Sequence, residues 1–235
     1  MEDSMQKIAL VTGASSGIGE AVAKRLAREV AHVILVGRDM ARLDAVREAI
    51  VAAGGSASQY SVDLTDNNAV LEFSTKLAAA HTHLDILVQC AGGLTFDTDP
   101  KFTGNPFASI AAHIQMNFTS KVLMLNACIE LLEKAARPVI LDVSSQASSF
   151  PEVTDAAHPF AARTHHERGY VWSMRAVDGM NAMMQRDFPT FHVALVNPGL
   201  IATPLQAQHF ADVPKEAVRT PENLAEEIIR KIKGV

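Results

Sequence analysis

The sequence lacks three features that would each direct its interpretation: many cysteines, a long apolar run and an excess of positive charge. Its two cysteines, Cys90 and Cys128, lie in apolar runs, so we expect buried thiols in a reducing compartment rather than a disulfide. No apolar run approaches the roughly 18 residues that cross a bilayer, and the acidic first residues do not resemble a signal peptide. The net charge of −5 gives no electrostatic reason to bind nucleic acid or an acidic membrane. We therefore expect a soluble, cytoplasmic protein without nucleic-acid or membrane partners.

Short apolar runs alternate with longer amphipathic segments along the chain. Six runs predict buried parallel strands: Lys7–Thr12, His32–Gly37, Ala57–Val62, Leu84–Cys90, Pro138–Ser144 and His192–Asn197. Six segments predict helices: Gly17–Val30, Met40–Ala53, Asn67–Ala80, Pro106–Ala135, Tyr170–Asp187 and Pro221–Lys233. This alternation predicts a single α/β domain over residues 1–235, with a doubly wound parallel sheet and a ligand site beyond the carboxyl ends of its strands.

A glycine-rich octet, TGASSGIG at residues 12–19, joins the first predicted strand to the first predicted helix. Glycines permit a tight turn and a close backbone approach to a pyrophosphate, and a helix N-terminus offers unpaired N–H groups to it. The octet therefore predicts a Rossmann-like dinucleotide site rather than a plain connection. Its expected cofactor-binding residues are Gly13, Ser15, Ser16, Gly17, Ile18 and Gly19.

Three later segments, VDLT at 62–65, QCAG at 89–92 and NPGLIATP at 197–204, follow the octet in order. Together with it they resemble the short-chain dehydrogenase/reductase family, which usually has Asn-Asn-Ala-Gly where QCAG stands. The resemblance implies that the first segment holds the adenine and the last holds the nicotinamide carboxamide. The further cofactor-binding residues that it implies are Asp63, Leu64, Gln89, Ala91, Gly92, Pro198, Gly199, Ile201 and Thr203.

The residues after the second predicted strand bear on which nicotinamide cofactor binds. A carboxylate there would bond the ribose hydroxyls of NAD, whereas an arginine favours the 2′-phosphate of NADP. The strand ends at Gly37, which is followed by Arg38 and then Asp39. A guanidinium suits a phosphate in geometry and charge, so Arg38 favours NADP(H). Asp39 keeps NAD(H) as the alternative.

The family resemblance also implies an Asn, a Ser, a Tyr and a Lys around the reacting carbonyl. Asn117 and Ser145 match the first two, and Tyr170 matches the phenol that exchanges the proton. Met174 stands where the family has the lysine that lowers the tyrosine pKa and holds the nicotinamide ribose. A thioether supplies neither positive charge nor a strong donor, so we expect weakened chemistry.

Other departures from the family pattern surround these residues. Segment 146–169 is longer than the family's usual gap, and His165, His166 or Arg163 within it would be able to supply a proton or a charge, although a polar surface loop is the plainer interpretation. The histidine spacing predicts no metal site. The family's final strand has no counterpart, so we expect six strands, with the oligomer contact built around that strand either absent or altered.

Two functions remain in competition. The first is an NADP(H)-dependent reductase of a small carbonyl compound, whose apolar or aromatic character is suggested by Phe96, Phe102, Phe107 and Trp172. The second is a catalytically inactive NADP(H)-binding relative that regulates a partner or stabilises an oligomer. The retained Ser145, Tyr170 and Asn117 favour the reductase, and a homo-oligomer is expected in either case.

Overall fold

The computed structural model describes residues 7–94, 107–149, 168–209 and 214–234. Within these residues six parallel strands form one sheet in the order β3-β2-β1-β4-β5-β6, which confirms the predicted doubly wound α/β fold. The strands are β1 (Ile8–Thr12), β2 (His32–Gly37), β3 (Ala57–Ser61), β4 (Ile86–Gln89), β5 (Val139–Val143) and β6 (His192–Val196). The strand order reverses between β1 and β4, where sheets of this kind bind ligands.

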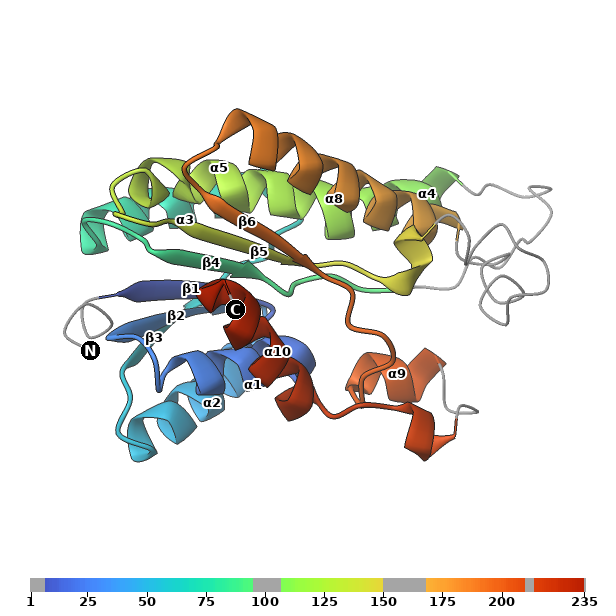
Figure 1. The fold of residues 1–235 in the computed structure, drawn as a ribbon, viewed down its shortest axis with the longest axis horizontal. Helices are drawn as coiled ribbons and strands as arrows, with labels where there is room; N and C mark the ends of the chain where they lie inside the picture. The colour runs from blue at the N-terminus through green and yellow to red at the C-terminus, as the bar shows by residue number, and fades with distance from the viewer. Residues whose placement is uncertain (1–6, 95–106, 150–167, 210–213, 235) are drawn as a thin grey trace.

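Helices cover both faces of the sheet (Figure 1). One face carries α1 (Gly17–Leu26), α2 (Met40–Ala52) and α10 (Pro221–Lys233). The other face carries α3 (Asn67–Ala80), α5 (Ser120–Leu132) and α8 (Arg168–Asp187). Because both faces of the sheet are covered, most of the strands are largely apolar runs rather than alternating ones. The exception is β3 at the edge of the sheet, whose sequence ASQYS has no fully buried residue.

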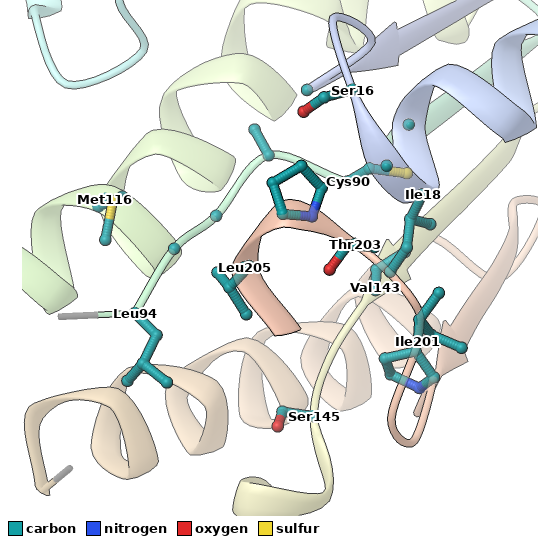
Figure 2. Close-up of a pocket in the computed structure, with 18 of the residues that line it drawn as sticks. Ser16, Ile18, Cys90, Leu94, Met116, Val143, Ser145, Ile201, Thr203 and Leu205 are labelled. Atoms are coloured by element: carbon teal, nitrogen blue, oxygen red, sulfur yellow. The ribbon is translucent and has the colours of Figure 1, made fainter. Parts of the chain in front are cut away.

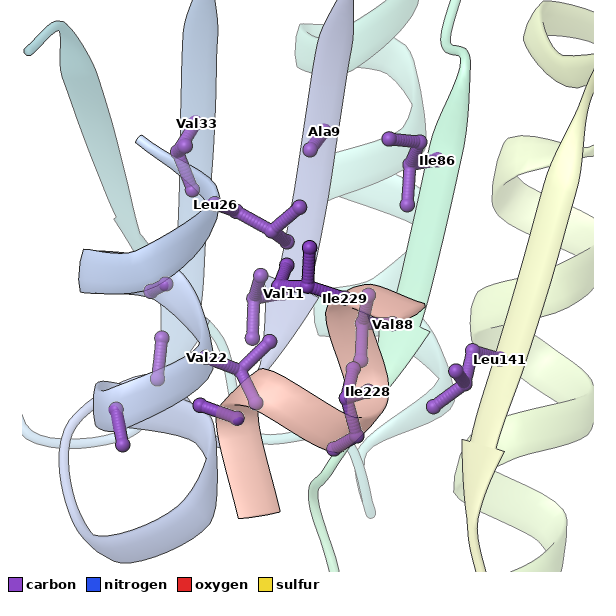
Figure 3. Close-up of a cluster of buried hydrophobic side chains, with 14 of the residues drawn as sticks. Ala9, Val11, Val22, Leu26, Val33, Ile86, Val88, Leu141, Ile228 and Ile229 are labelled. Carbon is purple, nitrogen blue, oxygen red and sulfur yellow. The ribbon is translucent and has the colours of Figure 1, made fainter. Parts of the chain in front are cut away.

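The helix α10 closes the first of these layers. Its Ile228 and Ile229 belong to the same buried cluster as Val22 and Leu26 of α1 and Val11 of β1 (Figure 3). The helix begins as its sequence predicts: Thr220 Oγ1 accepts a hydrogen bond from Asn223 N at 3.2 Å, and a proline occupies the first turn. None of the described helices combines the length and hydrophobicity needed to cross a bilayer.

The predicted helix Pro106–Ala135 is not a single α-helix in the described structure. It is divided into α4 (Phe107–His113), a π-helical segment η2 (Ile114–Thr119) and α5. A π-helical segment widens the turn locally and occurs frequently at functional sites. Here it carries Asn117, so the departure from regular α-helix coincides with a residue that the sequence marks as catalytic.

Truncation of Ile228 tests the role of α10 in the core. The side chain is fully buried, so Ile228→Ala should lower the free energy of unfolding by about 2–5 kcal/mol, through lost apolar contacts and a residual cavity. Denaturant unfolding measures this change. Arg230→Ala, at an exposed position of the same helix, should change the free energy by less than about 0.5 kcal/mol. Equal losses in the two variants would contradict the proposed packing.

Candidate functional site

A cavity of about 330 Å³ opens at the carboxyl ends of the strands. Fifteen of the sixteen residues predicted to bind the cofactor line it: Gly13, Ser15, Ser16, Gly17, Ile18, Gly19, Arg38, Asp63, Leu64, Ala91, Gly92, Pro198, Gly199, Ile201 and Thr203. The exception is Gln89, which is only 1% exposed and whose side chain lies in the interior. The cavity is therefore where the strand order predicts a ligand site.

The glycine turn after β1 brings backbone segments unusually close together. Gly13 has a φ of +67°, and a Cβ on it would lie 2.9 Å from Ala91 N. A Cβ on Gly19 would lie 2.3 Å from Gly13 O. Any side chain at Gly19 would therefore displace the turn, and its absence leaves peptide groups rather than side chains at this wall of the cavity.

The first turn of α1 faces the same wall. Ser16 is its N-cap residue, but within the described structure its side chain makes no capping hydrogen bond. In α2 and α3, by contrast, Asp39 and Asp66 cap the helix with their carboxylates. The N–H groups of α1 consequently have no side-chain oxygen of their own cap to bond, and a helix N-terminus in this state suits an anionic ligand.

The two charged residues after β2 differ in position. Arg38 is exposed and lines the cavity. Asp39 does not line it, because its carboxylate accepts from Arg42 N at 3.1 Å and lies 3.2 Å from Arg42 Nε. At the end of β3, hydrogen bonds from Thr65 hold the pKa of Asp63 below its ordinary value. Asp63 is thus ionised and fixed at the rim of the cavity.

Three of the four residues expected to be catalytic line the opposite part of the cavity, namely Ser145, Tyr170 and Met174. Figure 2 shows Ser16 and Ser145 toward opposite sides of the space, with Thr203 and Leu205 between them. Ser145 Oγ accepts a hydrogen bond from Ala147 N at 3.2 Å, which leaves its hydroxyl hydrogen for another acceptor. Met174 is 4% exposed, so a thioether, not a charge, forms this wall.

Two side chains of α8 fix the segment that carries Ser145. Arg175 Nη1 donates to Ser148 O at 2.5 Å, and Ser144 Oγ donates to Asp178 Oδ1 at 2.5 Å. Arg175 is partly buried and bonds the short helix η3 (Gln146–Ser148). Because Arg175 and Tyr170 both belong to α8, these bonds attach the segment that carries Ser145 to the helix that carries the phenol.

Asn117 lies behind the cavity wall rather than in it. Its Oδ1 accepts from Gly93 N at 2.8 Å, and its Nδ2 donates to Gly93 O at 3.0 Å and to Ser173 Oγ at 3.1 Å. The side chain is completely buried. Asn117 joins the loop after β4 to α8. Its side chain does not line the cavity, but Gly93, whose backbone it bonds, does.

Apolar side chains also line the cavity, among them Leu94, Met116 and Leu205. Phe107 and Trp172, which the sequence analysis associated with the substrate, are 77% and 46% exposed and do not line the described cavity. Phe96, Phe102, Arg163, His165 and His166 lie outside the described residues. Among the described residues no cluster of His, Cys, Asp and Glu is able to hold a metal ion.

The model of the family described as short chain dehydrogenase matches residues 7–214. The chain belongs to the short-chain dehydrogenase family. A 3β-hydroxysteroid dehydrogenase of Mediterraneibacter gnavus is 31% identical over 212 residues, covering 88% of this chain and 71% of the relative. A fatty acyl-CoA reductase of Acinetobacter baylyi is 36% identical over 145 residues, or 61% of this chain, which spans only 48% of that protein.

Solved structures give the same fold. A short chain dehydrogenase of Shigella flexneri complexed with NADP is 24% identical, with a TM-score of 0.83 over 99% of this chain and 93% of the other. An alcohol dehydrogenase of Thermococcus sibiricus complexed with 5-hydroxy-NADP is 25% identical, with a TM-score of 0.81 over 97% of this chain and 91% of the other. The path of the chain around the cavity is thus that of the short-chain dehydrogenase fold.

Some cavity residues were not singled out from the sequence. Met116 lines the cavity from the π-helical segment, and Leu94 lines it from the position after Gly93, which Asn117 holds. Gln206 lines the wall from α9 (Pro204–His209). The only sequence signal for these three was their closeness to a motif: Met116 precedes Asn117, Leu94 follows QCAG and Gln206 follows NPGLIATP.

The two thiols should be unreactive in the folded protein. Desolvation by burial raises the pKa of Cys90 and of Cys128 to about 12, although Cys90 borders the cavity and is partly exposed. Only the thiolate reacts with an alkylating agent, so labelling at pH 8 should be negligible, and mass spectrometry measures it. The unfolded chain should take up two labels at the same pH. Rapid labelling of folded protein at Cys90 would contradict this environment.

Proposed function

We propose that this short-chain dehydrogenase uses NADP(H) to reduce the carbonyl group of a small, apolar compound. The observation that carries the choice of cofactor is the contrast between Arg38 and Asp39. The guanidinium lines the cavity, whereas the carboxylate that would select NAD is engaged as the N-cap of α2. A positive charge at this place favours a 2′-phosphate.

The residues present fit such a cofactor. Gly13 and Gly19 form a backbone cradle that a Cβ would fill, and the uncapped first turn of α1 suits a pyrophosphate. Asp63 and Leu64 would hold the adenine, and Pro198, Gly199, Ile201 and Thr203 would hold the nicotinamide. The complexes of the Shigella and Thermococcus relatives with NADP compounds support this assignment.

The reduction requires a hydride and a proton. Bound NADPH supplies the hydride to the carbonyl carbon. In the proposal Ser145 donates a hydrogen bond to the carbonyl oxygen, and Tyr170 transfers its phenolic proton to that oxygen to complete the alcohol. Leu94, Met116 and Leu205 exclude water and accept the apolar part of the substrate. The phenolate then recovers a proton from solvent.

Met174 makes this proton transfer harder than in relatives with lysine. Met174 itself supplies no ammonium to stabilise the phenolate as it forms, and loss of one preorganised charge typically costs about 3 kcal/mol, or roughly a hundredfold in rate. Reduction uses the phenol in its protonated form, which is the ordinary form of a tyrosine side chain at neutral pH. The rate of reduction, from carbonyl to alcohol, is therefore lowered less by Met174 than the rate of the reverse oxidation.

The same observation supports the alternative function. A chain that keeps the cofactor cradle but has an apolar residue at position 174 would bind NADP(H) without turnover, as a regulatory or oligomer-forming relative. Ser145 and Tyr170 both line the cavity, and the contacts of Arg175 and Asp178 join the helix of the phenol to the segment of the serine, which supports the reductase. In either case we propose a homodimer, to which the exposed Val122 of α5 and Met183 of α8 would contribute.

Replacement of Arg38 tests the cofactor assignment. Arg38→Ala should weaken NADPH binding about tenfold, because a charged hydrogen bond to the 2′-phosphate is lost, and should leave NADH affinity unchanged. Fluorescence titration gives both dissociation constants. Arg42→Ala is the matched control, since this arginine pairs with Asp39 and does not line the cavity. Equal weakening of both cofactors, or no change in either, would contradict the assignment.

Substitutions in α8 test the chemistry. With a panel of ketones, quinones and aldehydes, Tyr170→Phe should abolish NADPH consumption, whereas Tyr60→Phe, on β3, should not. Met174→Lys should raise the rate about a hundredfold by restoring a charge. Met174→Leu keeps the volume without charge and should leave the rate unchanged.

The outcome distinguishes the two functions. Turnover that survives in Tyr170→Phe would exclude the proposed proton donor. Tight NADPH binding without any turnover in the natural chain, together with turnover gained in Met174→Lys, would establish the inactive relative instead.

A further inference from the structure

Lys121 of α5 is the one lysine or arginine that is fully buried among the described residues. Its side chain is 2% exposed, and that of Asp142 on β5 is 1% exposed. Nζ donates a hydrogen bond to Gln89 O at 2.6 Å and lies 3.3 Å from Asp142 Oδ1. Asn181 of α8 donates to the other carboxylate oxygen at 3.1 Å. A buried polar cluster thus joins α5 and α8 to the carboxyl ends of β4 and β5.

Stability alone does not account for such a cluster. Removing two charges from water is expensive, and well-packed apolar residues of similar volume stabilise a core equally well or better. The shorter contact of the ammonium is to the backbone carbonyl of Gln89, not to the carboxylate. Asp142 therefore balances the charge, while the directional bond holds the end of β4.

The backbone that Lys121 holds leads directly into the cofactor cavity. Two residues after Gln89, Ala91 N donates to Thr12 Oγ1 at 3.1 Å. A Cβ on Gly13 would lie 2.9 Å from Ala91 N, so the loop after β4 supports the glycine turn. The other end of this loop is held by Asn117, one helical turn before Lys121. A shift of the Gln89 backbone would therefore also shift the glycine turn that is proposed to bind the pyrophosphate.

We propose that Lys121 is a positioning residue for the dinucleotide site, which it serves by fixing the carbonyl of Gln89 and, through loop 90–93, the glycine turn after β1. The inference rests on the proposed function, since it assigns this role toward the proposed cofactor. Lys121 acts through the backbone and makes no contact with the cavity. Lys121 is thus a buried amino group near the carboxyl edge of the sheet. Met174, by contrast, lines the cavity at the position where the family resemblance implies a lysine.

Three variants separate positioning from simple stability. Asp142→Asn removes the balancing charge but keeps the amine, and hence its bond to Gln89 O. Lys121→Met removes the bond and leaves a buried carboxylate without its cation. Lys121→Met/Asp142→Asn removes the bond and both charges. For each variant, thermal unfolding reports stability, NADPH titration reports cofactor affinity, and hydrogen exchange of the Ala91 and Gly93 amides in the free protein reports the order of the loop.

Stability and positioning should follow different patterns. Lys121→Met should have the lowest melting temperature, because an unpaired charge is buried, and the double variant should recover part of the loss. NADPH affinity should fall and the two amides should exchange faster, each by about fivefold to tenfold, in both variants without Lys121. Asp142→Asn should keep both values within about twofold of the natural chain, because the side-chain amino group of Lys121 remains and still donates to Gln89 O.

The proposal would be overturned if NADPH affinity and amide exchange changed in parallel with the melting temperature across the three variants. It would also be overturned if the double variant kept the NADPH affinity and the amide exchange of the natural chain. Failure of the proposed function is distinguishable from this result. If the natural chain binds no NADPH, the cofactor assignment is wrong, and the exchange of Ala91 and Gly93 still decides whether Lys121 orders the loop.

Discussion

The close approach of three backbone segments at the carboxyl edge of the sheet determines the rest of the site. The turn after β1 folds back on the start of α1, where a Cβ on Gly19 would lie 2.3 Å from Gly13 O, and the loop after β4 presses on the same turn. This arrangement exposes peptide groups and the N-terminus of a helix to one cavity. It also makes the cavity depend on the supports of the loop after β4, which are Thr12, Asn117 and Lys121.

Charge is distributed unevenly around the site in the described part of the chain. The wall beside Tyr170 is apolar at Met174, whereas an ammonium is buried against Asp142, below the sheet edge. Burial raises the pKa of Asp142, and the nearby Lys121 opposes that rise. The proposed chemistry accordingly relies on hydrogen bonds and on the cofactor rather than on a fixed positive charge at the phenol. Such a site suits proton donation to a carbonyl better than proton removal from an alcohol.

The sequence predicted the sheet well because strands covered on both faces leave a strong signal. All six strands lie within the predicted runs, and 15 of 16 predicted cofactor residues meet at one cavity. Gln89 is the exception because strand alternation directs its side chain to the same face as Leu87, under α5. The division of the helix at Asn117 had no sequence signal, since no proline or glycine lies between Phe107 and Leu132.

Tertiary contacts decided the remaining positions. Arg175 bonds Ser148 only because α8 packs beside the turn after β5. Lys121 is buried because α5 crosses the ends of β4 and β5, and helical periodicity alone does not predict a lysine facing the sheet.

A crystal structure of the complex with NADPH tests the central claim most directly. The account predicts the pyrophosphate at the first turn of α1, the 2′-phosphate at Arg38, and the nicotinamide beside Tyr170 with a thioether, not a cation, next to its ribose. NADPH bound elsewhere, a phenol turned away from the nicotinamide, or a basic side chain against that ribose would contradict it.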